Sequence, residues 1–259
     1  MFRIAALSTT ALALSLTAAA AATGVGLTDD RTLVMFDTET LEVTGTMDVE
    51  GVDRLLGIDL RPSNNTLVGV TDDMRIVTID TATGAATDLS TMNTPLEVAD
   101  MAVIVDFNPM ADRLRLMTGT TNHRVNVDTG EVTVDGSLNW APEDDNSEAS
   151  PMIAAAAYIN SYGKPEATAM YDIDAGLGAL LQQTSPNDGT LATIGMLNVE
   201  NPGEAMAFDI QTDAEGTNSA WLVTNNTIHS VDLETGAATA AGTIEAEGQI
   251  RDLTVLPAM

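Results

Sequence analysis

Hydrophobic and polar residues alternate along most of the chain, in short runs that end at Gly, Asn or Asp. Residues 103–138 show the pattern most clearly. They divide into four alternating runs separated by turn residues: 103–107, 114–117, 124–128 and 131–135. A period of two with this punctuation is typical of antiparallel hairpins and not of helices. The segment is therefore predicted to form four short strands.

The same four-strand unit recurs along the chain. Three hairpin tips have matching sequences, Thr28-Asp29-Asp30, Thr71-Asp72-Asp73 and Thr224-Asn225-Asn226. The turn glycines at positions 84, 130, 189 and 236 are separated by 46, 59 and 47 residues. A period in the forties with four strands per unit indicates the blades of a β-propeller.

The two ends of the chain predict how the ring closes. Apolar first strands are expected at 55–60, 102–107, 153–159, 205–210 and 250–256. The last of these has no hairpins after it, whereas residues 24–47 supply three strands with no first strand before them. Pairing the two ends completes a blade and removes an exposed strand edge. The sequence thus predicts an all-β, five-bladed β-propeller, closed by pairing the C-terminal strand with the N-terminal blade.

The first residues are typical of a secretory signal peptide. Arg3 precedes an apolar run, Ile4–Leu16, and an Ala-rich segment, Ala18–Ala22. The prediction is a signal peptide at 1–22 and a single propeller domain at 23–259. An exported protein, periplasmic or extracellular, follows from this. The apolar run is shorter than the roughly 18 residues that a membrane-spanning helix needs, so no membrane insertion is expected.

The charge of the chain limits its partners. Lys and Arg total 10 against 38 Asp and Glu, for a net charge of −28, and there is no cysteine. Such an acidic surface repels nucleic acid and anionic membranes and favours solubility. Nucleic acid is therefore excluded as a partner, no disulfide can form, and a monomer is predicted.

Several motifs resemble a known family. They are Val-Asp-Phe-Asn-Pro (105–109), Ala-Asp-Arg-Leu-Arg (111–115), Arg-Val-Asn-Val-Asp-Thr-Gly (124–130), Asn-Asp-Gly-Thr-Leu (187–191) and Ala-Phe-Asp-Ile (207–210). With them the chain resembles a bacterial exported family described as domain of unknown function 4394. The resemblance implies a propeller-like fold and transfers no catalytic residue, because the family carries no assigned reaction.

Carboxylates are the abundant candidates for chemistry. Nucleophilic catalysis is not supported, since Cys and a Gly-x-Ser-x-Gly motif are absent and there are two His, His123 and His229. Asp72 and Asp73 at a hairpin tip, and Asp144 and Asp145 in the long polar connection 140–151, are candidate Ca²⁺ ligands. Turn formation is the competing interpretation, because Asp is favoured in tight turns. No cofactor is predicted, and Ca²⁺ is kept as the alternative.

Arginine is scarce, and it gathers in the most specific motifs. Arg113 and Arg115 alternate with leucines on one strand, and Arg124 lies on the expected partner strand. The side chains either tie blades together by pairing with carboxylates or form an anion site. The expected structural cluster comprises Arg113, Arg115, Arg124, Asn126, Asp106 and Asp128.

The predicted ligand site is a mouth of the central channel, the usual ligand position in propellers. Its candidate residues lie near the starts of first strands or in a hairpin turn: Asp53, Arg54, Glu204, Arg251 and His123. The leading function is a non-enzymatic binding or interaction module for a small molecule, a glycan or an envelope protein. The alternative is a hydrolase or lyase for a sugar or lactone, which needs two carboxylates about 5–9 Å apart in a pocket.

Overall fold

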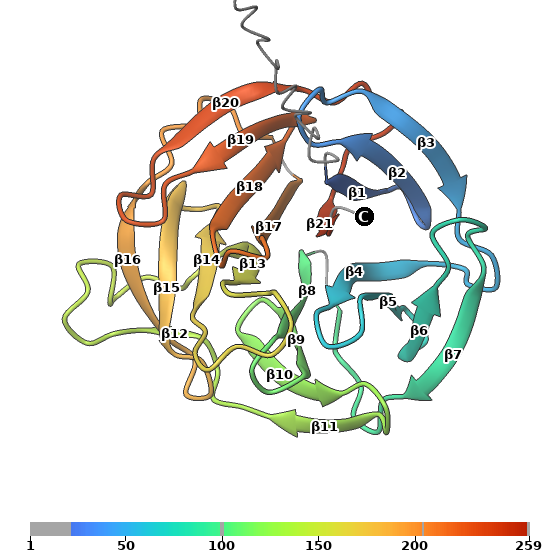
Figure 1. Cartoon of the computed structure of the whole chain (residues 1–259). Helices are drawn as coiled ribbons and strands as arrows, with labels where there is room; N and C mark the ends of the chain where they lie inside the picture. The colour runs from blue at the N-terminus through green and yellow to red at the C-terminus, as the bar shows by residue number, and fades with distance from the viewer. Residues whose placement is uncertain (1–21, 99–100, 204, 258–259) are drawn as a thin grey trace, which may run out of the picture.

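A computed structural model describes residues 22–98, 101–203 and 205–257, and it shows a ring of five β-sheets (Figure 1). Cavities lie along the axis of the ring between the inner strands, and we call this region the central channel. The expected signal peptide, residues 1–22, lies outside the described residues except for Ala22. Each sheet forms one blade, and its first strand lies at the channel. The prediction of a five-bladed β-propeller is confirmed.

The strands of each blade follow one another from the channel outward. The first blade contains β21 (Asp252–Leu256), β1 (Thr23–Thr28), β2 (Thr32–Asp37) and β3 (Val43–Asp48). The second contains β4 (Leu55–Arg61), β5 (Thr66–Thr71), β6 (Arg75–Ile79) and β7 (Ala86–Thr91). The third contains β8 (Val103–Asn108), β9 (Arg113–Thr118), β10 (Thr121–Asn126) and β11 (Glu131–Val134).

The remaining two blades follow the same order. The fourth contains β13 (Ile153–Tyr158), β14 (Met170–Asp174), β15 (Ala179–Ser185) and β16 (Thr190–Met196), with β12 (Asn139–Trp140) added in parallel at its outer edge. The fifth contains β17 (Met206–Thr212), β18 (Asn218–Thr224), β19 (Thr227–Val231) and β20 (Ala238–Thr243). The five inner strands contact one another in the cyclic order β21, β4, β8, β13, β17.

The first blade closes the ring as predicted. Strand β21 pairs antiparallel with β1, with Gly24 opposite Val255 and Gly26 opposite Leu253. The chain ends thus supply the inner strand and the second strand of one sheet. The facing edges of β1 and β21 are thus paired, which protects them from pairing with another chain.

Turn chemistry explains where the outer hairpins lie. The carboxylate of Asp80 accepts hydrogen bonds from the amides of Ala82 and Thr83, and the chain leaves the turn at Gly84 with φ +75°. A residue with a side chain is strained in this left-handed conformation. Asp37 and Asp232 accept the same pair of hydrogen bonds in their blades. The Asp232 turn ends at Gly236 with φ +80°, whereas the Asp37 turn ends at Leu41 with φ +62°. The Asp is therefore common to all three turns, and glycine relieves the strain in two of them.

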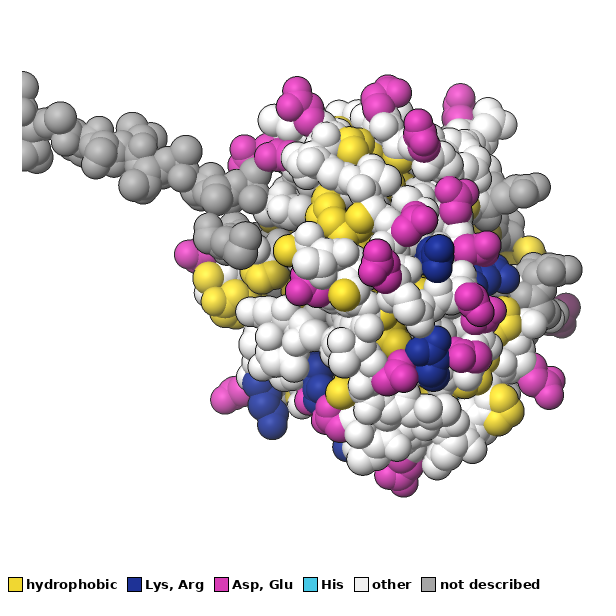
Figure 2. Space-filling view, turned by 90° about the vertical axis from the view of Figure 1, so that its right-hand side faces the viewer, with side chains coloured by type: hydrophobic (Ala, Val, Ile, Leu, Met, Phe, Trp, Pro, Cys, Tyr) yellow, Lys and Arg dark blue, Asp and Glu magenta, His cyan; other side chains and the backbone are white. Residues whose placement is uncertain are grey.

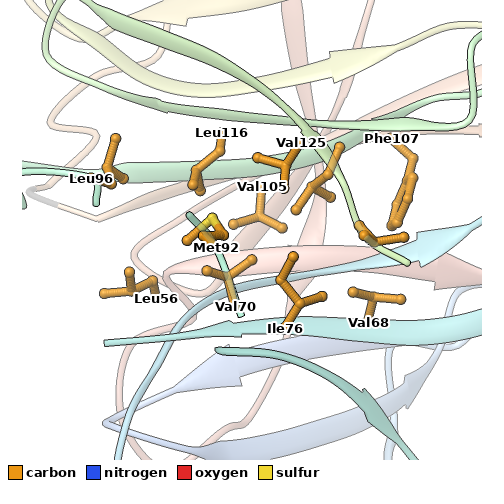
Figure 3. Close-up of a cluster of buried hydrophobic side chains, with 12 residues drawn as sticks. Leu56, Val68, Val70, Ile76, Met92, Leu96, Val105, Phe107, Leu116 and Val125 are labelled. Carbon is orange, nitrogen blue, oxygen red and sulfur yellow. The ribbon is translucent and has the colours of Figure 1, made fainter. Parts of the chain in front are cut away.

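Both faces of each middle strand are buried, because neighbouring blades pack face to face. In β9, Leu114 and Leu116 pack toward the second blade, whereas Met117 packs toward the fourth. Figure 3 shows the apolar cluster between the second and third blades, with Val70 and Ile76 facing Val125 from the neighbouring sheet. One such cluster fills each of the five interfaces. Burial of these side chains is the main stabilising contribution of the fold.

Three further observations bear on the sequence predictions. Trp140, expected in a surface loop, is buried in β12 at the outer edge of the fourth blade. Acidic side chains are spread over the face that Figure 2 shows, with few Lys or Arg among them. In the described residues, no helix is long and apolar enough to cross a membrane.

Candidate functional site

The beginnings of the inner strands surround a cleft at one mouth of the central channel. Its volume is about 820 Å³. We call it the Arg54 cleft, and it is lined by Arg54, Leu56, Asp72, Met74, Leu96, Val98, Met101, Ala102, Val103, Ala205, Met206 and Arg251. The size falls in the range of roughly 300–1,000 Å³ that is usual for small-molecule sites.

The two arginines of the Arg54 cleft have different environments. Arg251 donates to the backbone carbonyl oxygens of Asp29, Leu56 and Leu55 at 2.8, 3.0 and 2.6 Å, which fixes its side chain against the first and second blades. Burial lowers the pKa of Arg251 from its ordinary value. The Arg54 side chain is 52% exposed, and its Nε lies 3.5 Å from the carboxylate of Asp30. Arg54 therefore offers most of its donors to a ligand.

Apolar side chains form the rest of the wall. Met74, Met206 and Leu96 lie in the cleft beside Val98 and Met101, which are 38% and 52% exposed. Methionine adapts its shape to different apolar surfaces, so a wall of this kind accommodates ligands that are not tightly defined in shape. The cleft thus combines one accessible positive charge with a deformable apolar surface.

A second, smaller cavity lies further along the channel, at the second halves of the inner strands. Its volume is about 30 Å³. Asp59 of β4, Asp106 of β8 and Asp209 of β17 line it, and each offers one carboxylate oxygen to a triplet in which all lie within 4.8 Å of one another. The three side chains are buried.

These carboxylates also join the inner strands of neighbouring blades. Asp59 accepts a hydrogen bond from the amide of Phe107 at 2.7 Å, and Asp106 accepts one from the amide of Tyr158 at 2.9 Å. Asp209 accepts one from the amide of Val255 at 2.7 Å. The amides at the channel edge of a sheet have no strand partner, so the aspartates satisfy groups that would otherwise be costly to bury.

A fourth aspartate, at a different position along its inner strand, also links two blades. Asp252 accepts a hydrogen bond from the amide of Ile58 at 2.7 Å. The approach is close at Gly57, where an added Cβ would lie 2.7 Å from the Asp252 carboxylate. Glycine is therefore required at this position for β21 to sit against β4.

Burial shifts the titration of all four carboxyls. It raises the pKa of Asp59 and Asp106 well above the ordinary value, and repulsion between the carboxylates adds to the effect. Burial raises the pKa of Asp209 and Asp252 to about 7. Removal of a carboxylate from water disfavours its charged form, which is the physical cause in each case.

The structure disperses the predicted arginine cluster. Arg115 and Arg124 share the carboxylate of Asp135, at 2.7 and 2.6 Å, whereas Arg113 donates to the backbone carbonyl of Asp112. Their heads do not converge on an open cavity. Asp128 pairs with Arg61 of the second blade, at 2.7 Å, and Asn126 accepts a hydrogen bond from the Asp128 amide within a turn.

Asp106 differs most from the sequence expectation. From the sequence it is grouped with the arginines, and it does lie opposite Arg115 on the adjacent strand. Its carboxylate accepts the amide of Tyr158 at the channel, and among the described residues no Lys or Arg forms an ion pair with it. The strand register therefore places the backbones of Asp106 and Arg115 opposite each other, but their charged side chains do not pair.

The other predicted residues are distributed as follows. Arg54 and Arg251 line the cleft, Asp53 is exposed beside it, and Glu204 falls outside the described residues. His123 is buried in β10, two strands away from the channel strand of its blade, and burial lowers its pKa.

The four Ca²⁺ candidates do not form a group that could hold a metal ion in the part of the chain that the structure describes. Asp73 pairs with Arg75 at 2.9 Å, and Asp144 accepts the amides of Asn146 and Thr193 at 2.9 and 2.7 Å. Asp72 lines the Arg54 cleft, and Asp145 is exposed. These residues serve turns and surface pairs.

Sequence reasoning missed the carboxylate triplet. Each member is a charged residue enclosed by apolar neighbours within an inner strand, as in Ile58-Asp59-Leu60, Val105-Asp106-Phe107 and Phe208-Asp209-Ile210. The signal that could have found them is this repetition at one position of the blade. Equivalent positions of inner strands meet at the axis of a propeller, so carboxylates placed there converge.

The fold and its two channel sites define the class of protein, a five-bladed β-propeller with an apolar, arginine-bearing cleft at one mouth and buried carboxylates within. The family described as "Domain of unknown function (DUF4394)" matches residues 32–254. The chain belongs to this family. A comparison with curated proteins finds no match.

Solved structures from Bacteroides resemble the chain in fold. A structural genomics protein of unknown function from Bacteroides thetaiotaomicron matches at 14% identity with a TM-score of 0.51, over 93% of this chain and 68% of its own. A protein of unknown function from Bacteroides caccae matches at 11% identity and a TM-score of 0.45, over 88% and 75%. An auxiliary nutrient binding protein from Bacteroides ovatus matches at 12% identity with a TM-score of 0.43, over 76% of this chain and 55% of its own. At these identities the likeness to the first supports the fold alone.

Proposed function

We propose that the protein is an exported, non-enzymatic binding module, and that the Arg54 cleft holds a small molecule with an apolar body and a single anionic group. The observation that carries the proposal is the combination of a half-exposed Arg54 with an apolar wall at the channel mouth. A carboxylate paired with arginine gains charge-assisted hydrogen bonds, and the apolar part gains from burial.

The charge of the whole chain narrows the ligand class. The net charge is −28, so a ligand with several negative charges is repelled over most of its approach. One negative charge placed at Arg54 meets the least repulsion. Among the described residues that line the cleft, Asp72 is the one carboxylate, and there is neither His nor Ser. These residues do not supply the pair of acid and base groups that hydrolysis needs.

The alternative function, a carbohydrate or lactone hydrolase or lyase, depends on converging carboxylates. Asp59, Asp106 and Asp209 do converge, within 4.8 Å. Their cavity measures about 30 Å³, which is sufficient for a water molecule or an ion and not for a sugar ring. The convergence therefore does not favour this alternative.

Binding of decanoate tests the proposal. We expect isothermal titration to show saturable binding of decanoate to the parent protein. Acetate, which carries the charge alone, and decanol, which carries the chain alone, should bind more weakly. Arg54→Gln should weaken decanoate binding by about tenfold, the value of one hydrogen bond between charged groups.

The matched control is Arg75→Gln. Arg75 is another surface arginine of the second blade, and it pairs with Asp73 and Asp88 outside the lining of the cleft. It should leave decanoate binding unchanged. Equal binding of decanoate and decanol, or equal losses in the two variants, would contradict an anionic ligand at Arg54.

A further inference from the structure

We infer that the small cavity in the central channel is a Ca²⁺ site, with Asp59, Asp106 and Asp209 as its protein ligands. This site is separate from the Arg54 cleft, so the inference does not depend on the proposed function. The three residues come from three different blades, β4, β8 and β17. A single ion there would link them.

The geometry of the oxygens suits one ion. One oxygen from each carboxylate lies within 4.8 Å of the others. Two oxygens that share a Ca²⁺ at about 2.3–2.6 Å can be no more than roughly 5 Å apart, so the spacing fits coordination of a common ion. The cavity of about 30 Å³ has room for an ion and little else.

One oxygen of Asp106 is available to a ligand. The Asp106 residue is 6% exposed and lines the cavity. Its Oδ1 accepts a hydrogen bond from the Tyr158 amide, whereas among the described residues no side-chain or backbone group is recorded as a donor to its Oδ2. A carboxylate oxygen of this kind can coordinate a cation in the cavity.

The linking of blades does not by itself require three charges. Thr254 occupies the corresponding position of β21, and its hydroxyl oxygen accepts the amide of Leu60 at 3.2 Å. Leu60 follows Asp59 just as Phe107 follows Asp106, so a neutral threonine stands here where three other blades have an aspartate, although the Leu60 amide also donates to Asp59 Oδ1 at 2.7 Å. In β13 the position before Tyr158 is Ala157, with no acceptor at all. The carboxylates therefore carry negative charge beyond what the hydrogen bonds need.

The charges also lack a counterion in the protein. Among the described residues, neither Lys nor Arg forms an ion pair with Asp59, Asp106 or Asp209. A divalent cation would supply the missing positive charge to all three carboxylates.

The ligand atoms select the kind of ion. They are carboxylate oxygens, which suit hard cations and not the softer metals that prefer His or Cys. Ca²⁺ tolerates irregular coordination and takes six to eight oxygens. Water and the polar groups of Gln211 and Thr254, which also line the cavity, would supply the remainder.

The test uses the purified protein after removal of metals with EDTA. CaCl₂ is titrated at constant ionic strength, with binding followed by calorimetry and by the melting temperature. We expect saturable binding of one Ca²⁺ per chain and a matching rise in melting temperature. An absence of saturable binding up to millimolar CaCl₂ would overturn the inference.

Two variants locate the ion. Asp106→Asn keeps an acceptor for the Tyr158 amide and removes one charge, so the variant should fold, and its Ca²⁺ affinity should fall at least about tenfold, as for loss of an essential partner at a metal site. Asp172→Asn is the matched control, because Asp172 is fully buried, outside the triplet, and has its pKa raised by burial to about 8. Its Ca²⁺ affinity should be unchanged. Equal weakening in both variants would overturn the assignment.

Discussion

Arg115 shows how the protein accommodates charge in its interior. Its side chain is 1% exposed, and it donates to the carboxylate of Asp135 and to the side chain of Asn122, both at 2.7 Å. Weaker contacts at 3.3 Å reach Tyr158 and Asn187 in the fourth blade. Each partner satisfies part of the planar guanidinium, which is the condition for burying a charge without a large loss of stability.

We expect Arg115→Ala to lower the free energy of unfolding by about 3–5 kcal/mol, because Asp135 would lose a buried partner. Arg113→Ala is the control on the same strand. Arg113 makes a single hydrogen bond, to the adjacent carbonyl of Asp112, so its loss should cost no more than about 0.5 kcal/mol. Urea unfolding of the three proteins measures the difference. Similar losses in both variants would contradict the role assigned to Arg115.

At the scale of the element, the inner strands have two tasks. They form the channel edge of each blade, and their aspartates bond to the next inner strand. Strand β21 has an additional role, because it is the inner strand that the C-terminal part of the chain supplies to the first blade. In β21, the Asp252 carboxylate accepts a hydrogen bond from the Ile58 amide of the second blade. The Val255 amide donates a hydrogen bond to Asp209 of the fifth blade.

Deletion of residues 252–259 should therefore open the ring. The edge of β1 would be exposed, and both neighbouring blades would lose their contact with β21, so we expect loss of the single cooperative unfolding transition together with aggregation. Circular dichroism during heating and size-exclusion chromatography measure the two effects. A melting transition equal to that of the parent protein would contradict the importance of closure.

The sequence predicted the elements better than it predicted their contacts. Turns can be predicted from local sequence, because the residues that form them, such as Asp80 and Gly84, lie close together in the chain. Convergence of Asp59, Asp106 and Asp209 depends on three strands that are about fifty residues or more apart, and no local pattern gives their distance. Similarly, Asp128 was expected to pair with a nearby arginine and pairs instead with Arg61 of the preceding blade.

At the scale of the whole molecule, the balance of carboxyl groups sets the response to pH. The pKa values of Asp209 and Asp252 are raised to about 7, and that of Asp172 to about 8. A carboxyl with a higher pKa in the folded protein stabilises it at low pH, and this contribution is lost as the pH rises through the folded pKa. Asp112 and Asp128 behave oppositely, since hydrogen bonds from Arg61 lower their pKa.

We therefore expect the metal-free protein to lose stability as the pH rises from about 5 to 8, at most about 1.4 kcal/mol per pH unit for each such carboxyl. Below about pH 4, stability should fall again, because the carboxylates that pair with Arg61 become protonated. Urea unfolding at a series of pH values measures the profile, and Asp172→Asn should flatten its alkaline side. A steady rise in stability from pH 5 to 8 would contradict the raised pKa values.

The pairing of β1 with β21 has a consequence for the timing of folding. Strand β1 is among the first described segments to be synthesised, and its inner partner is among the last. At about 5–20 residues per second, the first strand waits on the order of tens of seconds with an unpaired edge. The ring cannot close before β21 has been made. During that interval, β1 presents less apolar surface to other chains, because positions 24 and 26 are glycines without side chains.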